Sequence, residues 1–169
     1  TLFERARGRA KVVAVLVDPS DALLTEVALI LKPDLIQLHG AETPRRAHEA
    51  RLLTGAGVIK ALAVRDGSDL DSAGQWAGAA DWLMFDAKPP RGSVLPGGVG
   101  AKFDWTLMRG RRFAQPWFLA GGLDPDTVAE AVGLTSAQAV DVSSGVESAP
   151  GVKDTARIAA FLRAVKRSR

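Results

Sequence analysis

Two patterns of apolar positions alternate along the chain. Short continuous apolar runs, typical of strands buried on both faces of a parallel sheet, are followed by segments in which apolar residues recur every three to four positions, as in amphipathic helices. The expected strands are residues 12–17, 34–40, 58–64, 82–85, 117–120 and 137–142. About six strand–helix units with short loops predict a parallel α/β sheet with right-handed crossovers.

The helices carry recognisable start signals. Ser20 or Asp21 can cap a helix that runs to Leu31, and Thr43 followed by Pro44 begins another that ends near residue 55. Further helices are expected over 68–79, from 103, over 124–132 and over 154–166. Asp124 and Pro125 are the expected start of the helix over 124–132.

Periodicity alone does not distinguish an open doubly wound sheet from a closed barrel. A (β/α)₈ TIM barrel usually needs roughly 250 residues and eight units, and this chain has 169 residues. It begins at Thr1 without an initiator Met, with Leu2, Phe3 and Ala6 arranged as in a helix already under way. As a single barrel domain, residues 1–169 would lack about the first two βα units; the open sheet remains the alternative.

Composition narrows the chemistry. Apolar residues make up 47% and charged residues 24%, as in ordinary globular proteins, and the net charge of +3 is scattered. These values favour a small anionic substrate weakly and a nucleic acid not at all. The chain has no Cys, which excludes disulfides and a Cys nucleophile, and its two His are too few for a typical metal cluster. No apolar run approaches the ~20 residues of a membrane span, so a cytoplasmic protein is expected.

The strand over 82–85 leads into Asp86 and then a glycine-rich loop, 89–102. Because parallel α/β proteins place their chemistry at the carboxyl ends of strands, Asp86 is a candidate acid beneath a closing loop. The alternative is an Asp that caps the next turn.

The last two strand ends predict an anion site. Gly121 and Gly122 precede a helix, and Ser143, Ser144 and Gly145 follow the last expected strand. Backbone N–H groups of two adjacent loops can converge on a phosphate, and barrel enzymes often bind phosphate after their last two strands. Each loop alone would also be explained as a tight turn.

Four further polar residues lie within the expected strands or near their ends. Gln37 and His39 point the same way along one strand and are candidate substrate contacts, although each could be a packed barrel residue. Asp141 could touch the substrate or orient Ser143. Lys60 lies mid-strand, where a charge is costly unless it is paired or faces the site, and its role is left open.

Several of these motifs together resemble the phosphoribosylanthranilate isomerase family. They are Gln37-Leu-His-Gly40, Phe85-Asp-Ala-Lys88 with its loop into Phe103-Asp-Trp105, Ala120-Gly-Gly-Leu123, and Asp141-Val-Ser-Ser-Gly-Val-Glu147, in the family's order over nearly the whole chain. The resemblance implies a (β/α)₈ barrel that catalyses the Amadori rearrangement of N-(5-phosphoribosyl)anthranilate in tryptophan biosynthesis, without metal or cofactor. The expected partner is a small phosphorylated substrate, with neither nucleic acid nor membrane, and a monomer or homodimer.

The resemblance also assigns the chemistry. Asp86 would be the general acid that protonates the ring oxygen of the sugar, and a Cys at the end of the family's first strand would be the general base. This chain has no Cys, so the base is missing from it. The alternatives are another phosphate-binding TIM-barrel enzyme, or a non-catalytic fragment that binds a phosphate ligand.

Overall fold

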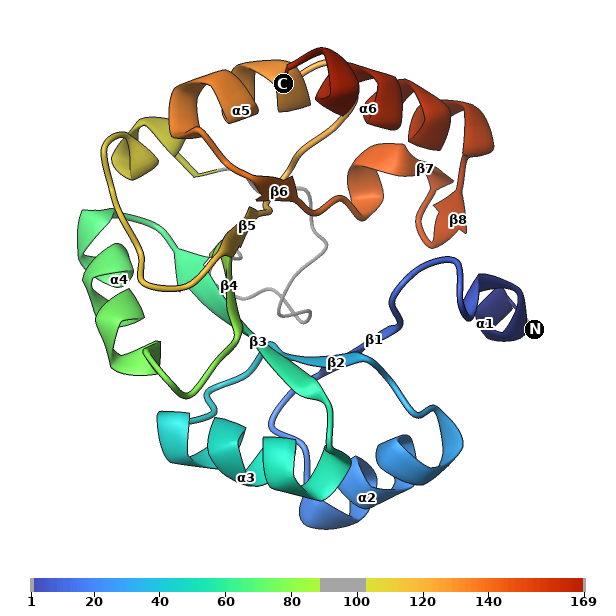
Figure 1. Ribbon diagram of the computed structural model, residues 1–169. Coiled ribbons are helices and arrows are strands. Elements are labelled where there is room, and N and C mark those ends of the chain that lie inside the picture. Colours follow the sequence, from blue (N-terminus) through green and yellow to red (C-terminus); the bar gives the residue numbers. More distant parts are fainter. Residues whose placement is uncertain (1, 89–102, 169) are drawn as a thin grey trace.

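A computed structural model describes residues 2–88 and 103–168 of the chain. Six strands pair in parallel in the order in which they occur in the sequence, so each neighbours the next. Figure 1 shows the helices in an arc outside the sheet. The strands are β1 Val13–Leu16, β2 Leu35–Leu38, β3 Gly57–Val64, β4 Trp82–Ala87, β5 Trp117–Leu119 and β6 Ala139–Val140. The parallel α/β prediction is confirmed.

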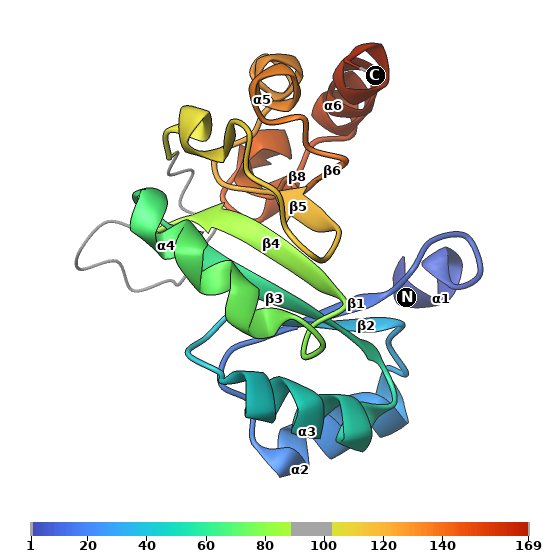
Figure 2. The same ribbon diagram turned by 60° about the vertical axis from the view of Figure 1, so that its left-hand side comes forward.

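The helices cover the outer face of this curved sheet. In Figure 2, α2 and α3 lie side by side below the sheet and α5 and α6 lie together above it. The α-helices are α1 Leu2–Ala6, α2 Asp21–Ile30, α3 Pro44–Thr54, α4 Gly67–Asp71, α5 Val128–Thr135 and α6 Thr155–Arg167, and the 3₁₀ turns are η1 Ser72–Trp76, η2 Trp105–Met108 and η3 Ser144–Val146. None of the helices among the described residues is long and apolar enough to cross a membrane.

Local sequence explains where the best-defined helices begin and end. The Ser20 hydroxyl accepts the Leu23 N–H at 3.2 Å, which caps α2 as expected. The Thr43 hydroxyl accepts the Arg46 N–H at 3.2 Å in the same way, and Pro44 occupies the first turn of α3. Gly55 closes α3 in the left-handed region with a φ of +67°.

The prediction that the first strand is buried on both faces is wrong. β1 is the first strand of the sheet, and Val13, Val15 and Val17 are 38%, 59% and 48% exposed. These residues alternate with Ala14 and Leu16 and so share the inner face of the sheet. In the part of the chain that the structure describes, no strand follows β1 on that side to cover them.

Other elements also differ from the predictions, among them the helix expected from 103, which is only the 3₁₀ turn η2. The helix expected over 68–79 is a single α-helical turn capped by Asp66 that tightens into η1. The helix expected from Asp124 begins at Val128, because the Asp124 carboxylate accepts the N–H groups of Asp126 and Thr127 and holds an extra turn. The strands β7 Glu147–Ala149 and β8 Val152–Lys153 form an antiparallel hairpin that the sequence does not predict, since such short strands show no periodicity.

Apolar side chains form two clusters, one on each face of the sheet. The larger, which we call the outer cluster, lies between the sheet and the helices and includes the fully buried Phe85, Leu119 and Leu24. The smaller lies on the inner face and comprises Ile59, Ala61, Met84 and Ala120 with Leu35, Trp82 and Phe118 packed against them. The inner cluster covers the inner face of the sheet below the carboxyl ends of the strands. The polar residues at those ends therefore lie next to apolar side chains.

Truncation of Phe85 tests the outer cluster. Phe85 is 0% exposed, and its ring centroid lies 4.5 Å from that of Phe113 and 5.6 Å from that of Trp117. We expect Phe85→Ala to lower the free energy of unfolding by about 3–5 kcal/mol, because the cavity removes contacts with both rings. Leu29→Ala is the matched control, since Leu29 is 69% exposed and should change stability by less than about 0.5 kcal/mol. Urea unfolding measures both, and equal losses would contradict this packing.

Candidate active site

Asp86 lies at the carboxyl end of β4 and faces the inside of the curved sheet. It alternates with Phe85, which points into the outer cluster, and shares a face with Met84 of the inner cluster. Its side chain is 15% exposed. One carboxylate oxygen accepts the N–H of Ala87 at 2.8 Å, and the other faces the neighbouring strands.

His39 and Gln37 complete a line of polar contacts to that second oxygen. The Nε2 atom of His39 lies 3.3 Å from Oδ2 of Asp86, and Nδ1 of His39 lies 2.9 Å from the side-chain nitrogen of Gln37. When the Gln37 amide donates to Nδ1, the proton of a neutral imidazole sits on Nε2 and faces Asp86. The structure thus brings together three of the candidate residues that the sequence indicates.

Asp141 joins the same site from β6. Its N–H donates to the Leu119 carbonyl at 2.8 Å, which continues the pairing of β6 with β5 beyond the last strand residue. The protein atoms packed around the Asp141 carboxyl raise its pKa, and the negative charge of Asp86 raises it further, whereas His39 and Lys153 act in the opposite direction. Asp141 is nevertheless exposed to solvent, so the site is open to a ligand at this point.

Gly121 brings the loop after β5 directly against Asp86. A side chain at Gly121 would place its Cβ 2.6 Å from the Ala87 nitrogen and 3.2 Å from Oδ1 of Asp86, and the φ of this residue is +86°. Both the close approach and the left-handed backbone require glycine here. The candidate acid and the first candidate phosphate loop are therefore neighbours.

Gly145 brings the second candidate phosphate loop against the first. A Cβ at Gly145 would lie 1.9 Å from the Leu123 carbonyl oxygen and 3.0 Å from the Asp124 Cα. Among residues 2–88 and 103–168, no acceptor takes the backbone N–H groups of Gly121, Gly122, Ser144 and Gly145. Two touching loops with unbonded N–H groups have the composition of an anion cradle.

Lys153 supports this loop and is not identified by the sequence motifs. Its ammonium donates to the carbonyl and hydroxyl of Ser143 at 2.9 and 3.2 Å and lies 2.6 Å from Glu147. These contacts tie the β7–β8 hairpin to the candidate phosphate loop. No periodic signal marks Lys153, because its place depends on a hairpin of very short strands.

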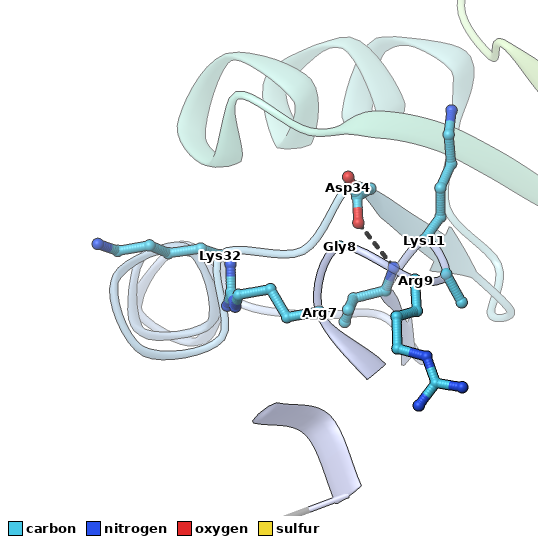
Figure 3. Close-up of a pocket in the computed structure, with 8 residues that line it drawn as sticks. Arg7, Gly8, Arg9, Lys11, Lys32 and Asp34 are labelled. Carbon is cyan, nitrogen blue, oxygen red and sulfur yellow. Dashed lines mark hydrogen bonds between the residues drawn. The ribbon is translucent and has the colours of Figure 1, made fainter. Parts of the chain in front are cut away.

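Other features of the structure lie away from these residues. The pocket in Figure 3, lined by Arg7, Arg9, Lys11, Lys32 and Asp34 among others, is at the amino-terminal ends of β1 and β2, opposite the ends that carry His39 and Asp86. The loop 89–102, expected to close over the site, lies outside the described residues. In the described ranges no group of three or more His, Cys, Asp or Glu residues is placed to hold a metal ion.

Comparison with known proteins gives consistent matches. A family model described as N-(5'phosphoribosyl)anthranilate (PRA) isomerase matches residues 2–164. The N-(5'-phosphoribosyl)anthranilate isomerase of Caulobacter sp. strain K31 is 60% identical over 157 residues, which are 93% of this chain and 74% of that protein. Its counterpart in Caulobacter vibrioides is 56% identical over an alignment that covers 99% of this chain and 77% of that protein.

Solved structures match over almost the whole chain. Phosphoribosyl anthranilate isomerase from Thermotoga maritima has a TM-score of 0.82 at 30% identity, over 98% of this chain and 78% of that one. A structure of the isomerase with reduced 1-(o-carboxyphenylamino)-1-deoxyribulose 5-phosphate has a TM-score of 0.80 at 28% identity, over 98% and 76%. A third, of monomers generated from the dimeric Thermotoga maritima isomerase, has a TM-score of 0.73 at 31% identity, over 92% and 72%.

Substitution of Gly145 tests the contact between the two loops. We expect Gly145→Ala to lower the free energy of unfolding by about 1–3 kcal/mol, because the new methyl group must displace the Leu123 carbonyl. Gly133→Ala is the control, since a Cβ at Gly133 in α5 meets no atom within 4 Å and alanine favours the helix. Thermal unfolding measures both, and a Gly145→Ala variant as stable as the parent would mean that the loops are not in contact.

The substitution Asp141→Asn tests the raised pKa of Asp141. A raised pKa means that the folded chain keeps a proton at pH values where the unfolded chain has lost it, so the free energy of unfolding falls as the pH rises from about 3.8 through the raised value. We expect Asp141→Asn, which has no such proton, to gain stability relative to the parent across that window and to keep a constant advantage above it. Urea unfolding between about pH 4 and pH 8 measures the difference. A difference independent of pH would show that the pKa is not raised.

Proposed function

The chain belongs to the N-(5'-phosphoribosyl)anthranilate isomerase family, and we propose that Asp86 is the general acid of its reaction. It is an isomerase of tryptophan biosynthesis with the TIM-barrel fold of its solved relatives. The observation that carries the proposal is the position of Asp86, at a strand end 3.3 Å from His39 and against Gly121.

The rearrangement adds a proton to the ring oxygen of the sugar and removes another proton from carbon. An acid protonates the ring oxygen of the aminoribose so that the ring opens, and a base then removes a proton from carbon to give an enolamine, which becomes the ketone. Asp86 projects above the apolar inner cluster, so its carboxyl group faces the inside of the curved sheet, where the substrate would lie. His39 fixes one carboxyl oxygen and Gly121 crowds the other, which limits the directions in which the acid can point.

The phosphate and the anthranilate are held by different residues. We place the phosphate at the N–H groups of Gly121, Gly122, Ser144 and Gly145 and at the Ser143 and Ser144 hydroxyls, because those two loops touch and their N–H groups are unbonded. Gln37, His39 and Asp141 would contact the remainder of the substrate from the inner face. Docking the phosphate next to Gly121 brings the sugar within reach of Asp86.

A base must be supplied for turnover. The family resemblance assigns it to a Cys, and the 169 residues contain none. We infer that a complete barrel carries the base on a βα unit additional to the six-stranded sheet described here. The supporting observation is that β1 lies at the edge of the described sheet, where a further parallel strand could pair with it, and that Val13 and Val15 on its inner face are exposed.

The substrate class, the cellular location and the assembly are proposed from the family membership. We propose a small phosphorylated substrate, a cytoplasmic setting and a monomeric or homodimeric assembly. One structural relative is described as a complex with a reduced deoxyribulose phosphate compound, and another as monomers of a dimeric isomerase.

The proposed function is tested by adding the base. The chain is assayed alone and joined to the amino-terminal residues of the Caulobacter sp. isomerase, by the change in fluorescence when the anthranilate adduct rearranges. We expect activity in the joined protein only. Binding of the reduced deoxyribulose phosphate compound with no turnover in either form would identify a phosphate-ligand binding module instead.

Asp86→Asn in the joined protein tests the acid. We expect kcat to fall by about 10²–10⁴-fold, because the amide cannot protonate the ring oxygen. Affinity for the reduced deoxyribulose phosphate compound should change by less than about threefold, since the phosphate loops are intact. Asp71→Asn is the control, as this carboxylate is 66% exposed and pairs with Arg111 away from the site. Near-normal kcat in Asp86→Asn would remove this residue from the mechanism.

A further inference from the structure

A buried ion pair lies behind the site, between Lys60 of β3 and Glu42 of the loop after β2. The Lys60 nitrogen is 2.7 Å from Oε2 of Glu42, and the two side chains are 4% and 1% exposed. Lys60 alternates with Ile59 and Ala61 of the inner cluster, so it points to the outer face, where its nitrogen lies 5.4 Å from the Trp76 ring centroid. Lys60 therefore does not reach the inner face where the substrate would bind.

Every proton of the Lys60 ammonium is used to hold the strand end of β2. The nitrogen donates to the Gly40 carbonyl at 2.7 Å and to the Leu38 carbonyl at 3.3 Å, in addition to Glu42. These two carbonyls flank His39 in the sequence. The backbone of His39 is thus anchored on both sides by one buried cation.

Glu42 ties the same segment to the loop after β1. Its carboxylate accepts the N–H of Asp18 at 2.9 Å and the N–H of Gly40 at 3.0 and 3.1 Å. Asp18 in turn accepts the Ala41 N–H at 2.8 Å, and a Cβ at Gly40 would lie 2.5 Å from the Asp18 carboxylate. This one carboxylate therefore joins the loops after β1 and β2 to the middle of β3.

Burying the two charges of this ion pair costs desolvation free energy, so the pair contributes little net stability to the fold. Burial of Glu42 opposes its ionisation, but the hydrogen bonds from Lys60 and from the Asp18 N–H outweigh it, so the pKa of Glu42 is lowered. Apolar pairs of similar volume usually stabilise a core at least as well as a buried ion pair. What an apolar pair cannot do is hold the carbonyls and N–H groups around His39.

We propose that Lys60 and Glu42 are positioning residues that fix the His39 imidazole against Asp86. The inference rests on the proposed function only for its consequence for turnover, since the placement of His39 is measured without it. Among the described residues, His39 is otherwise held by its contacts with Gln37 and Asp86 and by its own N–H, which donates to the Leu16 carbonyl at 2.8 Å. Loss of the ion pair frees the peptide groups on both sides of the ring.

Paired substitutions separate positioning from stability. Lys60→Met with Glu42→Leu removes both charges and every loop contact that they make. Lys60→Met with Glu42→Gln removes the charges but keeps an oxygen that can accept from Asp18 and Gly40. Leu24→Ala is the control for stability, because Leu24 is fully buried in the outer cluster, away from this network.

The histidine ring signals in NMR spectra give a readout that needs no turnover. The chain has only two histidines, and the exposed His48 on α3 serves as an internal reference. We expect the His39 signals to shift and broaden in both double variants, most in the Leu variant, with His48 unchanged. Leu24→Ala should lower the melting temperature and leave both rings unchanged.

Kinetics of the joined protein give the second readout. We expect kcat to fall by about tenfold to a hundredfold in the Leu variant, and less in the Gln variant, because a small displacement near the reacting atoms slows chemistry. KM should stay within about twofold of the parent, since the phosphate loops are intact. Either double variant, if folded with parental His39 signals and parental kcat, overturns the proposal. A joined parent protein without turnover would refute the proposed function, while the NMR signals would still decide whether the pair positions His39.

Discussion

The register of β4 against its neighbours is the constraint on which the site depends. Side chains alternate between the two faces of a strand, so a slip of one residue would turn Asp86 towards the helices and Phe85 towards the site. Phe85 prevents the slip, because its ring is fully buried against Phe113 and Trp117. An apolar residue on the outer face thereby determines the direction of a carboxylate on the inner face.

Much of this arrangement is readable from the sequence. The apolar runs locate all six strands of the sheet, and the positions of Gln37, His39 and Asp86 at strand ends are enough to place them on a common edge. Helices capped by Ser20 and Thr43 also begin where their start signals indicate. These features are local, since each depends on a few consecutive residues and on the two-residue period of a strand.

Features that depend on distant partners are not readable in this way. Val15 belongs to an apolar run that predicts burial on both faces, yet its exposure is decided by whether another strand lies beside β1. Lys60 stands out in its strand as an anomaly, but nothing local identifies Glu42, 18 residues earlier, as its partner. Lys153 acquires its place from a hairpin too short to have a periodic pattern. In each case the deciding contact is between segments that sequence patterns treat separately.

The protonation of Asp141 depends on the residues around it in the site. Packing of protein atoms around the Asp141 carboxyl raises its pKa, and the charge of Asp86 raises it further, whereas His39 and Lys153 act in the opposite direction. The folded chain therefore favours the protonated form of Asp141. A reaction that begins by protonating a ring oxygen needs a carboxyl group that holds a proton. Beside the proposed acid Asp86, the site thus contains a carboxyl group, that of Asp141, whose protonated form the surroundings favour.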